Sequence, residues 1–307
     1  MSSHSSSTRT PDAKLHPDEL DIDETLVRRL ISSQFAQWAG LPITRAPATG
    51  TDNAMYRLGD DMVVRLPRLP GGTDQAEKEH HWLPRLAPHL PLAVPEPLGK
   101  GVPGEGYELP WSVLRWLDGE NAQDAPVTDL PRAAVELGGF VTALRRLDAT
   151  DGPPSFRGGP VSANDGEVRA AIRDLGANGT VDAAIATAAW EETLRLPQWT
   201  GEPVWVHADL LPGNLLTRAG RLTAVIDFGG LGVGDPACDL LPAWTQFTAD
   251  TRALFREAAD VDDATWARGR GWALCFGLVA EHHYREKGHV LADVGLRAVR
   301  EVLGEYA

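Results

Sequence analysis

The chain is short of cysteine and has no long apolar run. Its 307 residues include two cysteines, Cys238 and Cys275, and neither belongs to a Cys-x-x-Cys pair. This pattern excludes a disulfide framework and a zinc site recognisable from sequence, and it favours a reducing compartment. The most apolar stretch near the C-terminus, residues 271–280, is far shorter than the roughly 20 residues that cross a bilayer. We therefore expect a cytoplasmic protein without membrane association.

Basic residues are also scarce relative to acidic ones. There are 29 Lys and Arg against 43 Asp and Glu, which gives a formal net charge of −14 at pH 7. An acidic protein is a poor match for the phosphate backbone of a nucleic acid, and it attracts cationic ligands. The same charge also suits a solvated surface that only keeps the protein in solution. The composition disfavours a nucleic-acid partner and leaves a cationic small-molecule partner open.

Hydrophobic periodicity and turn signals divide the chain into a strand-rich first part and a mainly helical second part. In the first part, helices are expected over residues 23–38 and 74–90, and strands over 54–58, 62–66 and 111–117. In the second part, helices dominate, with short strands at 204–206, 214–217 and 222–226. Residues 1–12 are rich in Ser and Thr and lack a signal-peptide core, so a disordered tail is expected. We predict an α+β protein of two lobes, residues 13–117 and 118–307.

The strongest chemical signal is a set of three polar side chains in the second lobe. Asp209 and Asn214 lie five positions apart on one expected loop, so both can point into one site. Asp227 ends a strand that should form a hairpin with the strand beginning at Asn214, which brings it back beside that residue. Carboxylate and amide oxygens suit Mg²⁺, which also takes phosphate oxygens as ligands. The pattern fits phosphoryl transfer, with Asp209 accepting a hydroxyl proton and Asn214 and Asp227 holding the metal.

At this point the sequence resembles a known family. His207-Ala-Asp209-Leu-Leu-Pro-Gly-Asn214, then Ile226-Asp227-Phe-Gly-Gly, then Gly234-Asp-Pro-Ala-Cys-Asp239-Leu are similar to motifs of the aminoglycoside phosphotransferase family. That family includes macrolide kinases and relatives of choline and homoserine kinases, and its fold is similar to that of protein kinases. The resemblance spans about residues 49–284. It implies an ATP- and Mg²⁺-dependent enzyme that phosphorylates a hydroxyl of a small molecule, an aminoglycoside or similar antibiotic. It also implies that His207 and Asp239 support the catalytic loop.

The first lobe would then supply the nucleotide site. Thr51, Asp52 and Asn53 follow a glycine between two expected strands, where small polar groups can contact phosphate. By resemblance, a basic residue on the next strand contacts the α- and β-phosphates and pairs with a helix glutamate. Arg65 stands in that position, with Glu79 as its expected partner and Glu77 as the alternative.

The adenine contacts are expected where residues 111–117 leave the first lobe. By resemblance, backbone groups around Arg115 and Leu117 would bond the base of ATP, and GTP is not excluded as the donor. Two positions depart from the common family pattern: Ala208 replaces a glycine, and Leu211 stands where many relatives have histidine. We expect Ala208 to keep ordinary φ values and to be tolerated.

The acceptor site and the function class leave alternatives open. Acidic and aromatic residues near the C-terminus would line an acceptor site: Asp260, Asp262, Asp263, Glu281 and Glu286, with Trp266, Trp272, Tyr284, His282 and His283. Each is equally compatible with a helix surface or a core. A macrolide or metabolite kinase, a protein kinase, a catalytically idle nucleotide-binding module and a metal hydrolase built on His207 and Asp209 remain alternatives. The sequence carries no signal for an oligomeric state.

Overall fold

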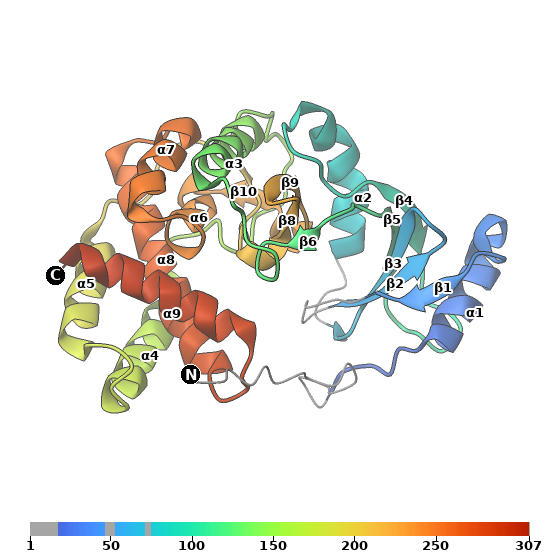
Figure 1. The fold of residues 1–307 in the computed structure, drawn as a ribbon, viewed down its shortest axis with the longest axis horizontal. Coiled ribbons are helices and arrows are strands. Elements are labelled where there is room, and N and C mark those ends of the chain that lie inside the picture. The colour runs from blue at the N-terminus through green and yellow to red at the C-terminus, as the bar shows by residue number, and fades with distance from the viewer. Residues whose placement is uncertain (1–17, 47–52, 71–74, 307) are drawn as a thin grey trace. The chain divides into compact units, whose positions relative to one another are not determined.

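The computed structural model describes residues 18–46, 53–70 and 75–306 (Figure 1). The chain forms two compact units, the first from residues 1–80 and 97–116, the second from residues 81–96 and 117–307. The predicted tail at residues 1–12 lies outside the described residues. The predicted lobe boundaries stay a prediction, and the second unit differs from them by including residues 81–96.

The first unit is built on an antiparallel sheet of five strands. In spatial order these are β1 (Ile43–Arg45), β2 (Asn53–Leu58), β3 (Met62–Pro67), β5 (Trp111–Arg115) and β4 (Pro97–Gly101). The strands expected at 54–58 and 62–66 pair as a hairpin, with Ala54 opposite Leu66. Gly59, with a φ of +62°, lies at its turn, a conformation that glycine adopts without a steric penalty.

Helix α1 (Glu24–Gln34) covers part of this sheet's core. It begins at Asp23, whose side chain accepts a hydrogen bond from the Leu26 N–H at 2.7 Å, as expected for an N-cap. The predicted helix to residue 38 is too long, because Phe35 leaves helical geometry and a 3₁₀ turn (Ala36–Trp38) follows. This break directs the Phe35 ring against Trp38 and Trp111, at centroid distances of 4.9 and 5.4 Å.

Helix α2 (Gln75–Leu86) is followed by a 3₁₀ turn (Ala87–His89), so the helical conformation expected up to residue 90 is present in two pieces. The helix belongs to the first unit as far as residue 80 and to the second from residue 81.

Helices make up most of the second unit, which confirms the expected α+β organisation. They are α3 (Leu130–Arg145), α4 (Asp165–Ala177), α5 (Ala183–Arg195), α6 (Pro242–Thr245), α7 (Ala249–Ala259), α8 (Asp263–Tyr284) and α9 (Val290–Leu303). Helices α8 and α9 cross closely, since a Cβ on Gly277 would lie 2.8 Å from the carbonyl oxygen of Gly295. None of the helices in the described ranges is both long enough and apolar enough to span a membrane.

Two small sheets complete the second unit. One has the order β6 (Glu120–Asn121), β8 (Leu215–Arg218) and β9 (Arg221–Val225), and the other pairs β7 (Val204–Val206) with β10 (Gly232–Gly234). The β8–β9 turn has two central residues, Ala219 and Gly220, with φ values of 49° and 75°, as a tight hairpin turn requires. This hairpin and the β7–β10 pair position the loop from residue 207 to residue 214.

Candidate active site

Asp209 and Asn214 are joined directly at the start of the β8–β9 hairpin. The Nδ2 of Asn214 donates to the Oδ2 of Asp209 at 2.8 Å and to its backbone carbonyl at 2.9 Å. Because the amide nitrogen faces Asp209, the amide oxygen of Asn214 faces away from that carboxylate and is the atom suited to bind a cation. The structure thus brings these two predicted side chains together.

The backbone of Asp227 lies beside Asn214. Strands β8 and β9 pair Leu215 with Val225, and the Ile226 N–H donates to the Asn214 carbonyl at 2.9 Å. Asp227 follows at once, half-buried and with a φ of 63°. The predicted hairpin therefore returns the chain to Asn214, while the metal-binding role of Asp227 stays a prediction.

The donor atoms at this place fit magnesium. An amide oxygen and a carboxylate from neighbouring backbone positions are hard ligands, and Mg²⁺ commonly takes one or two such protein groups together with water and phosphate oxygens. In the part of the chain that the structure describes, no three or more His, Cys, Asp or Glu side chains are grouped so that they could hold a metal ion. The residues present fit an ion that shares its coordination with a nucleotide.

Asp239 supports the backbone before Asp209. It lies in a 3₁₀ helix (Pro236–Leu240), is 1% exposed, and accepts hydrogen bonds from the N–H groups of His207 at 2.8 Å and Ala208 at 2.6 Å. Burial raises the pKa of Asp239 to about 7, and the two N–H donors oppose that rise. The predicted support by Asp239 therefore acts through two backbone hydrogen bonds.

His207 is a fully buried support beneath the same loop. Its Nδ1 accepts from the Asp209 N–H at 3.2 Å, and its Nε2 lies 3.1 Å from the Ile226 carbonyl oxygen. One nitrogen accepts and the other donates, so the ring is neutral with its hydrogen on Nε2. His207 links the loop that carries Asp209 to the end of β9.

Ala208 has left-handed backbone geometry, with a φ of 68°. The expectation that it keeps ordinary φ values is wrong. Both of its neighbours are fixed, because His207 bonds to Ile226 and the Asp209 side chain to Asn214. The surrounding contacts therefore impose a conformation that a residue with a Cβ ordinarily avoids.

Arg157 is a site residue that sequence reasoning missed. Its Nη1 lies 2.5 Å from the Oδ1 of Asp209 and donates to the Ala208 carbonyl at 2.8 Å. It comes from a loop between α3 and α4, about fifty residues before Asp209. Nothing in that Pro- and Gly-rich sequence distinguishes it from any other surface arginine.

Arg65 and Glu79 form a buried ion pair in the first unit. The Nη1 of Arg65 donates to the Oε1 of Glu79 at 2.9 Å, and Nη2 contacts Oε2. Their side chains are 7% and 0% exposed. Glu77 instead contacts Lys100 at the surface, so the structure distinguishes between the two predicted partners. The nucleotide-binding role of the pair stays a prediction.

Two polar groups near Arg65 lack hydrogen-bond partners among the described residues. Asn53 begins β2 and is 8% exposed, and its Oδ1 is buried and unbonded. Ser112, directly opposite Arg65 on β5, has a buried and unbonded Oγ. Thr51 and Asp52 lie outside the described residues. Buried polar groups normally have partners, so Asn53 is a reasonable contact for a bound ligand.

The predicted adenine contacts lie at the end of β5. Arg115 is the last residue of that strand, opposite Met62, and its exposed side chain lies 3.3 Å from Asp61. Leu117 follows two residues later and is half-buried. Their backbone roles toward a nucleotide base stay predictions.

Most of the acidic residues expected to bind the acceptor already have protein partners. These are Arg145 and Arg146 for Asp260 (3.2 and 3.1 Å), the Thr265 N–H for Asp262 (2.7 Å), Arg256 for Asp263, and Arg285 for Glu281 (3.7 Å). Glu286 is exposed beyond α8, and Trp272 is a core residue at 6% exposure. That these residues line an acceptor site stays a prediction. The contacts with other protein groups do not favour it.

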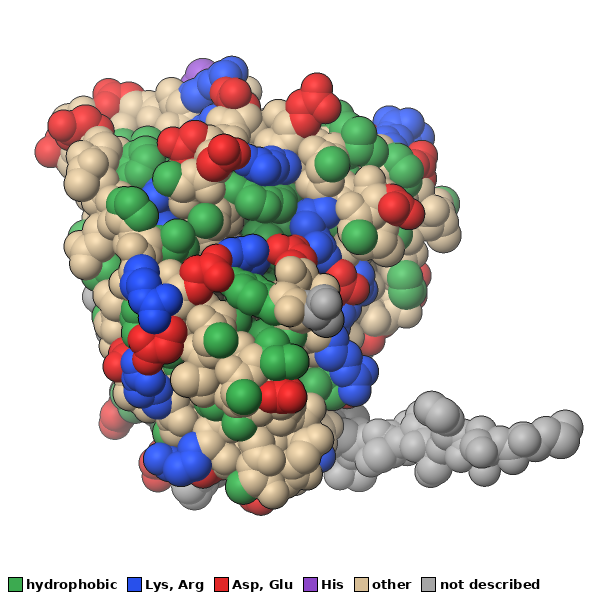
Figure 2. Space-filling view, turned by 90° about the vertical axis from the view of Figure 1, so that its left-hand side faces the viewer, with side chains coloured by type: hydrophobic (Ala, Val, Ile, Leu, Met, Phe, Trp, Pro, Cys, Tyr) green, Lys and Arg blue, Asp and Glu red, His purple; other side chains and the backbone are tan. Residues whose placement is uncertain are grey.

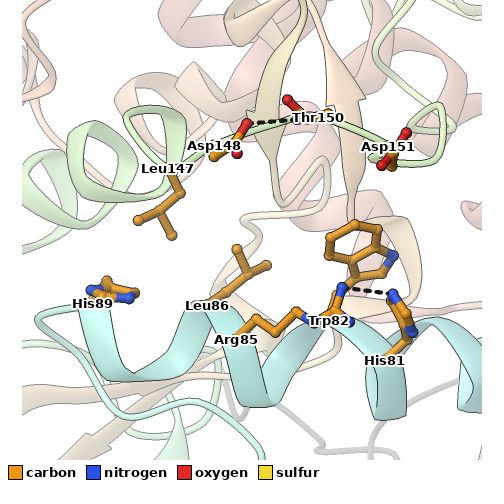
Figure 3. Close-up of a pocket in the computed structure, with 9 residues that line it drawn as sticks. All are labelled: His81, Trp82, Arg85, Leu86, His89, Leu147, Asp148, Thr150 and Asp151. Atoms are coloured by element: carbon orange, nitrogen blue, oxygen red, sulfur yellow. Dashed lines mark hydrogen bonds between the residues drawn. The ribbon is translucent and has the colours of Figure 1, made fainter.

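A separate groove of the second unit contains none of the residues around Asp209. Figure 3 shows Trp82 and Leu86 of α2 directed toward residues 147–151, whereas Arg85 extends along the helix to His81, with 2.8 Å between Nη1 and Nε2. Within it, hydrogen bonds from the Thr150 side chain and from the Thr150 N–H, the latter at 2.9 Å, lower the pKa of Asp148. Elsewhere on the surface, Figure 2 shows acidic and basic side chains interspersed rather than gathered by sign.

Comparisons with known proteins show a family and a fold. The model of the phosphotransferase enzyme family matches residues 43–272, whereas no curated protein sequence matches the chain. The GDP complex of wild-type aminoglycoside 2'-phosphotransferase-IIIa is 18% identical, with a TM-score of 0.73 and coverage of 93% of this chain and 100% of that one. The apoenzyme of macrolide 2'-phosphotransferase MphH from Brachybacterium faecium is 25% identical, with a TM-score of 0.58 and coverage of 90% and 98%. A streptomycin–ATP–APH(2")-IIa ternary complex is 16% identical, with a TM-score of 0.55 and coverage of 90% and 99%. The predicted kinase-like fold is confirmed.

Proposed function

Because this chain belongs to the phosphotransferase enzyme family, we propose that it transfers the γ-phosphoryl group of ATP, with Mg²⁺, to a hydroxyl of a small molecule. The family to which the chain belongs and its fold identify it as a phosphotransferase that acts on a hydroxyl group. The donor nucleotide, the metal and the acceptor are the proposed parts. The observation that supports them is the joined pair of Asp209 and Asn214, with the backbone of Asp227 beside it.

Asp209 is the proposed catalytic residue. Its carboxylate would accept a hydrogen bond from the acceptor hydroxyl, orient the oxygen toward the phosphorus, and take the proton as the new bond forms. Asn214 and Asp227 would hold Mg²⁺, which when bound neutralises charge on the phosphate oxygens. Positioning and charge compensation supply most of the rate enhancement in this type of reaction.

Arg65 is the proposed phosphate contact of the first unit. Glu79 holds its guanidinium from one side, and arginine can bind a phosphate through its remaining N–H groups. Thr51, Asp52 and Asn53 would add contacts to phosphate, and backbone groups at Arg115 and Leu117 would bond the base. Complexes with GDP and with ATP among the similar structures support a nucleotide donor and leave GTP as the alternative.

An aminoglycoside or similar antibiotic is the first acceptor to test. The acidic composition and the kanamycin, gentamicin and streptomycin complexes of similar proteins support it. A less cationic acceptor such as a macrolide is the second candidate, because the side chains beside Asp209 favour it. Arg157 contributes a positive charge there, and the Phe156 ring, 66% exposed, lies 4.5 Å from that guanidinium.

The test is a screen of amino sugars, macrolides and hydroxylated metabolites with ATP or GTP, with and without Mg²⁺. Mass detection of an added phosphoryl group identifies the acceptor. Asp209→Ala should retain nucleotide binding and lose transfer by about 10²–10⁴-fold. Asp148→Ala, an exposed acid in the separate groove, is the matched control and should keep full activity. Transfer by Asp209→Ala at the parent rate would show that its assigned role is wrong.

We also infer a cytoplasmic location from the state of the cysteines. Cys238 and Cys275 are both free and buried. Burial raises the pKa of the Cys238 thiol well above its usual value and that of Cys275 to about 12, so both remain protonated and unreactive. Free thiols suit a reducing compartment.

A further inference from the structure

The geometry points to Arg157 as a positioning residue that holds the Asp209 carboxylate in its reactive orientation. This role rests on the proposed function, since it concerns how Asp209 meets the acceptor hydroxyl. Three observations support this role: the contact of the guanidinium with Asp209, the backbone hydrogen bonds of the loop that carries Arg157, and the aromatic rings beside the side chain.

Arg157 and Asn214 hold Asp209 from two sides. Arg157 contacts Oδ1 at 2.5 Å, and Asn214 donates to Oδ2 at 2.8 Å. Each carboxylate oxygen therefore has one fixed donor and keeps lone pairs for a hydroxyl. With only the Asn214 contact, rotation of the carboxyl group about its Cβ–Cγ bond would be restricted at one oxygen instead of two. With both contacts, its plane is defined before any substrate arrives.

The loop that carries Arg157 is fastened along the segment from residue 230 to residue 235. Backbone hydrogen bonds join Ser155 N to Val233 O (3.1 Å), Val233 N to Pro153 O (2.7 Å) and Asp235 N to Gly158 O (3.0 Å). The two chains meet so closely that a Cβ on Gly234 would lie 2.3 Å from the Cα of Gly158. The position of the Arg157 backbone is therefore set by contacts that do not involve Asp209.

The side chain of Arg157 is also confined by aromatic rings. Its guanidinium lies 4.5 Å from the Phe156 ring centre and 5.7 Å from that of Phe276, and the side chain is 19% exposed. A charge partly removed from water interacts more strongly with a neighbouring carboxylate than a surface charge does. Arg157 thus combines a fixed backbone, a confined side chain and a direct contact with the catalytic group.

Two other roles for Arg157 make different predictions. If it only anchored its loop, its removal would lower stability and leave the turnover of the folded enzyme unchanged. If it blocked Asp209 until substrate arrived, its removal would raise turnover. A positioning role predicts lower kcat with nucleotide KM unchanged, because the misplaced group acts in the transition state and not in nucleotide binding.

The experiment compares the parent protein with Arg157→Ala, Arg157→Lys and the control Arg270→Ala. Arg270 is a fair match, because it is 23% exposed, contacts Glu192 at 2.6 Å and Glu305 at 3.3 Å, and lies over the Tyr306 ring at 5.0 Å. For each protein, kcat, the KM for nucleotide and the thermal midpoint are measured with an acceptor that the parent phosphorylates. Guanidinium ion is added to Arg157→Ala far below denaturing concentration.

The expected result is a fall in kcat of about 10–100-fold for Arg157→Ala, the scale on which a misplaced catalytic group reduces turnover. Nucleotide KM should stay within about threefold. Arg157→Lys and added guanidinium should each restore part of the rate, since both return a cation beside Oδ1. Arg270→Ala should keep parent kcat whatever its thermal midpoint.

Unchanged or raised kcat in Arg157→Ala would overturn the positioning role. A fall in kcat that neither lysine nor guanidinium restores, and that Arg270→Ala shares, would also overturn it by indicating general loss of structure. Those outcomes leave the proposed function intact, because the parent still transfers phosphate. Failure of the parent on every acceptor would instead remove the proposed function, and the role of Arg157 with it.

Discussion

Removing Glu79 should destabilise the first unit by about 3–5 kcal/mol, the cost of breaking a buried ion pair by removing one of its two members. Arg65 would keep its charge with a side chain only 7% exposed, after losing both contacts to the Glu79 carboxylate. Gln75 would also lose a hydrogen bond, the one that its Nε2 donates to the Oε1 of Glu79 at 3.2 Å. Glu79→Leu removes the partner while keeping a side chain of similar size.

The single substitution of Arg65 and the double substitution of both residues test whether the loss of stability comes from breaking the ion pair. Arg65→Met leaves a fully buried carboxylate and should cost a similar amount. Arg65→Met with Glu79→Leu leaves no unpaired charge, so most of the lost stability should return. The double variant should nevertheless bind nucleotide poorly, because the cation proposed to contact phosphate is gone.

Urea unfolding followed by circular dichroism measures these differences, with equal m-values as the check that the same surface unfolds. Glu77→Leu is the control, because Glu77 has a 68% exposed side chain paired with Lys100 at the surface, and it should change stability by less than about 0.5 kcal/mol. Equal losses in Glu79→Leu and Glu77→Leu would refute the assignment of a buried, structurally required pair.

Two further predictions concern the loop before Asp209. Ala208→Gly should raise stability by up to about 1 kcal/mol in urea unfolding, since relief of left-handed strain exceeds the added freedom of the unfolded chain; a clear loss would mean that the strain is absent. Asp239→Asn should flatten the pH dependence of unfolding. The pKa of Asp239 in the folded protein, about 7, lies above the ordinary pKa of aspartate. Its contribution to the free energy of unfolding is therefore complete at a pH below that ordinary pKa, and it is lost as the pH rises to about 7. Parallel curves for parent and variant between pH 4 and 7 would contradict this.

The parts of the fold that rest on local signals were predictable from sequence. Asp23 caps α1 as its position before an apolar stripe indicates, and β8 and β9 form the expected hairpin, with Ala219 and Gly220 at its turn. The contact of Asp209 with Asn214 follows from a spacing of five on one loop. Each of these depends on residues close together in the chain.

The features that sequence reasoning missed depend on distant segments. Arg157 reaches Asp209 only because its loop is bonded to the chain around Val233, and no local pattern encodes that pairing. Strand β10 is glycine-rich, with weak strand propensity, and it forms because it pairs with β7. The left-handed φ of Ala208 is likewise imposed by contacts made on both sides of it. Contacts between segments that are distant in the sequence therefore determine the position of Arg157, the formation of β10 and the backbone conformation of Ala208.

In the loop that carries Phe156 and Arg157, the position of the backbone does not depend on which side chain stands at position 156. Its anchoring to the segment around Val233 uses mostly backbone atoms, which are the same whatever side chain stands at position 156. The ring of Phe156 is largely open to solvent, so replacing it removes one of the two rings beside the Arg157 guanidinium and leaves the Arg157 backbone in place. Under the proposed function, position 156 is therefore a place to vary a side chain near Asp209 while the backbone that carries Arg157 is kept.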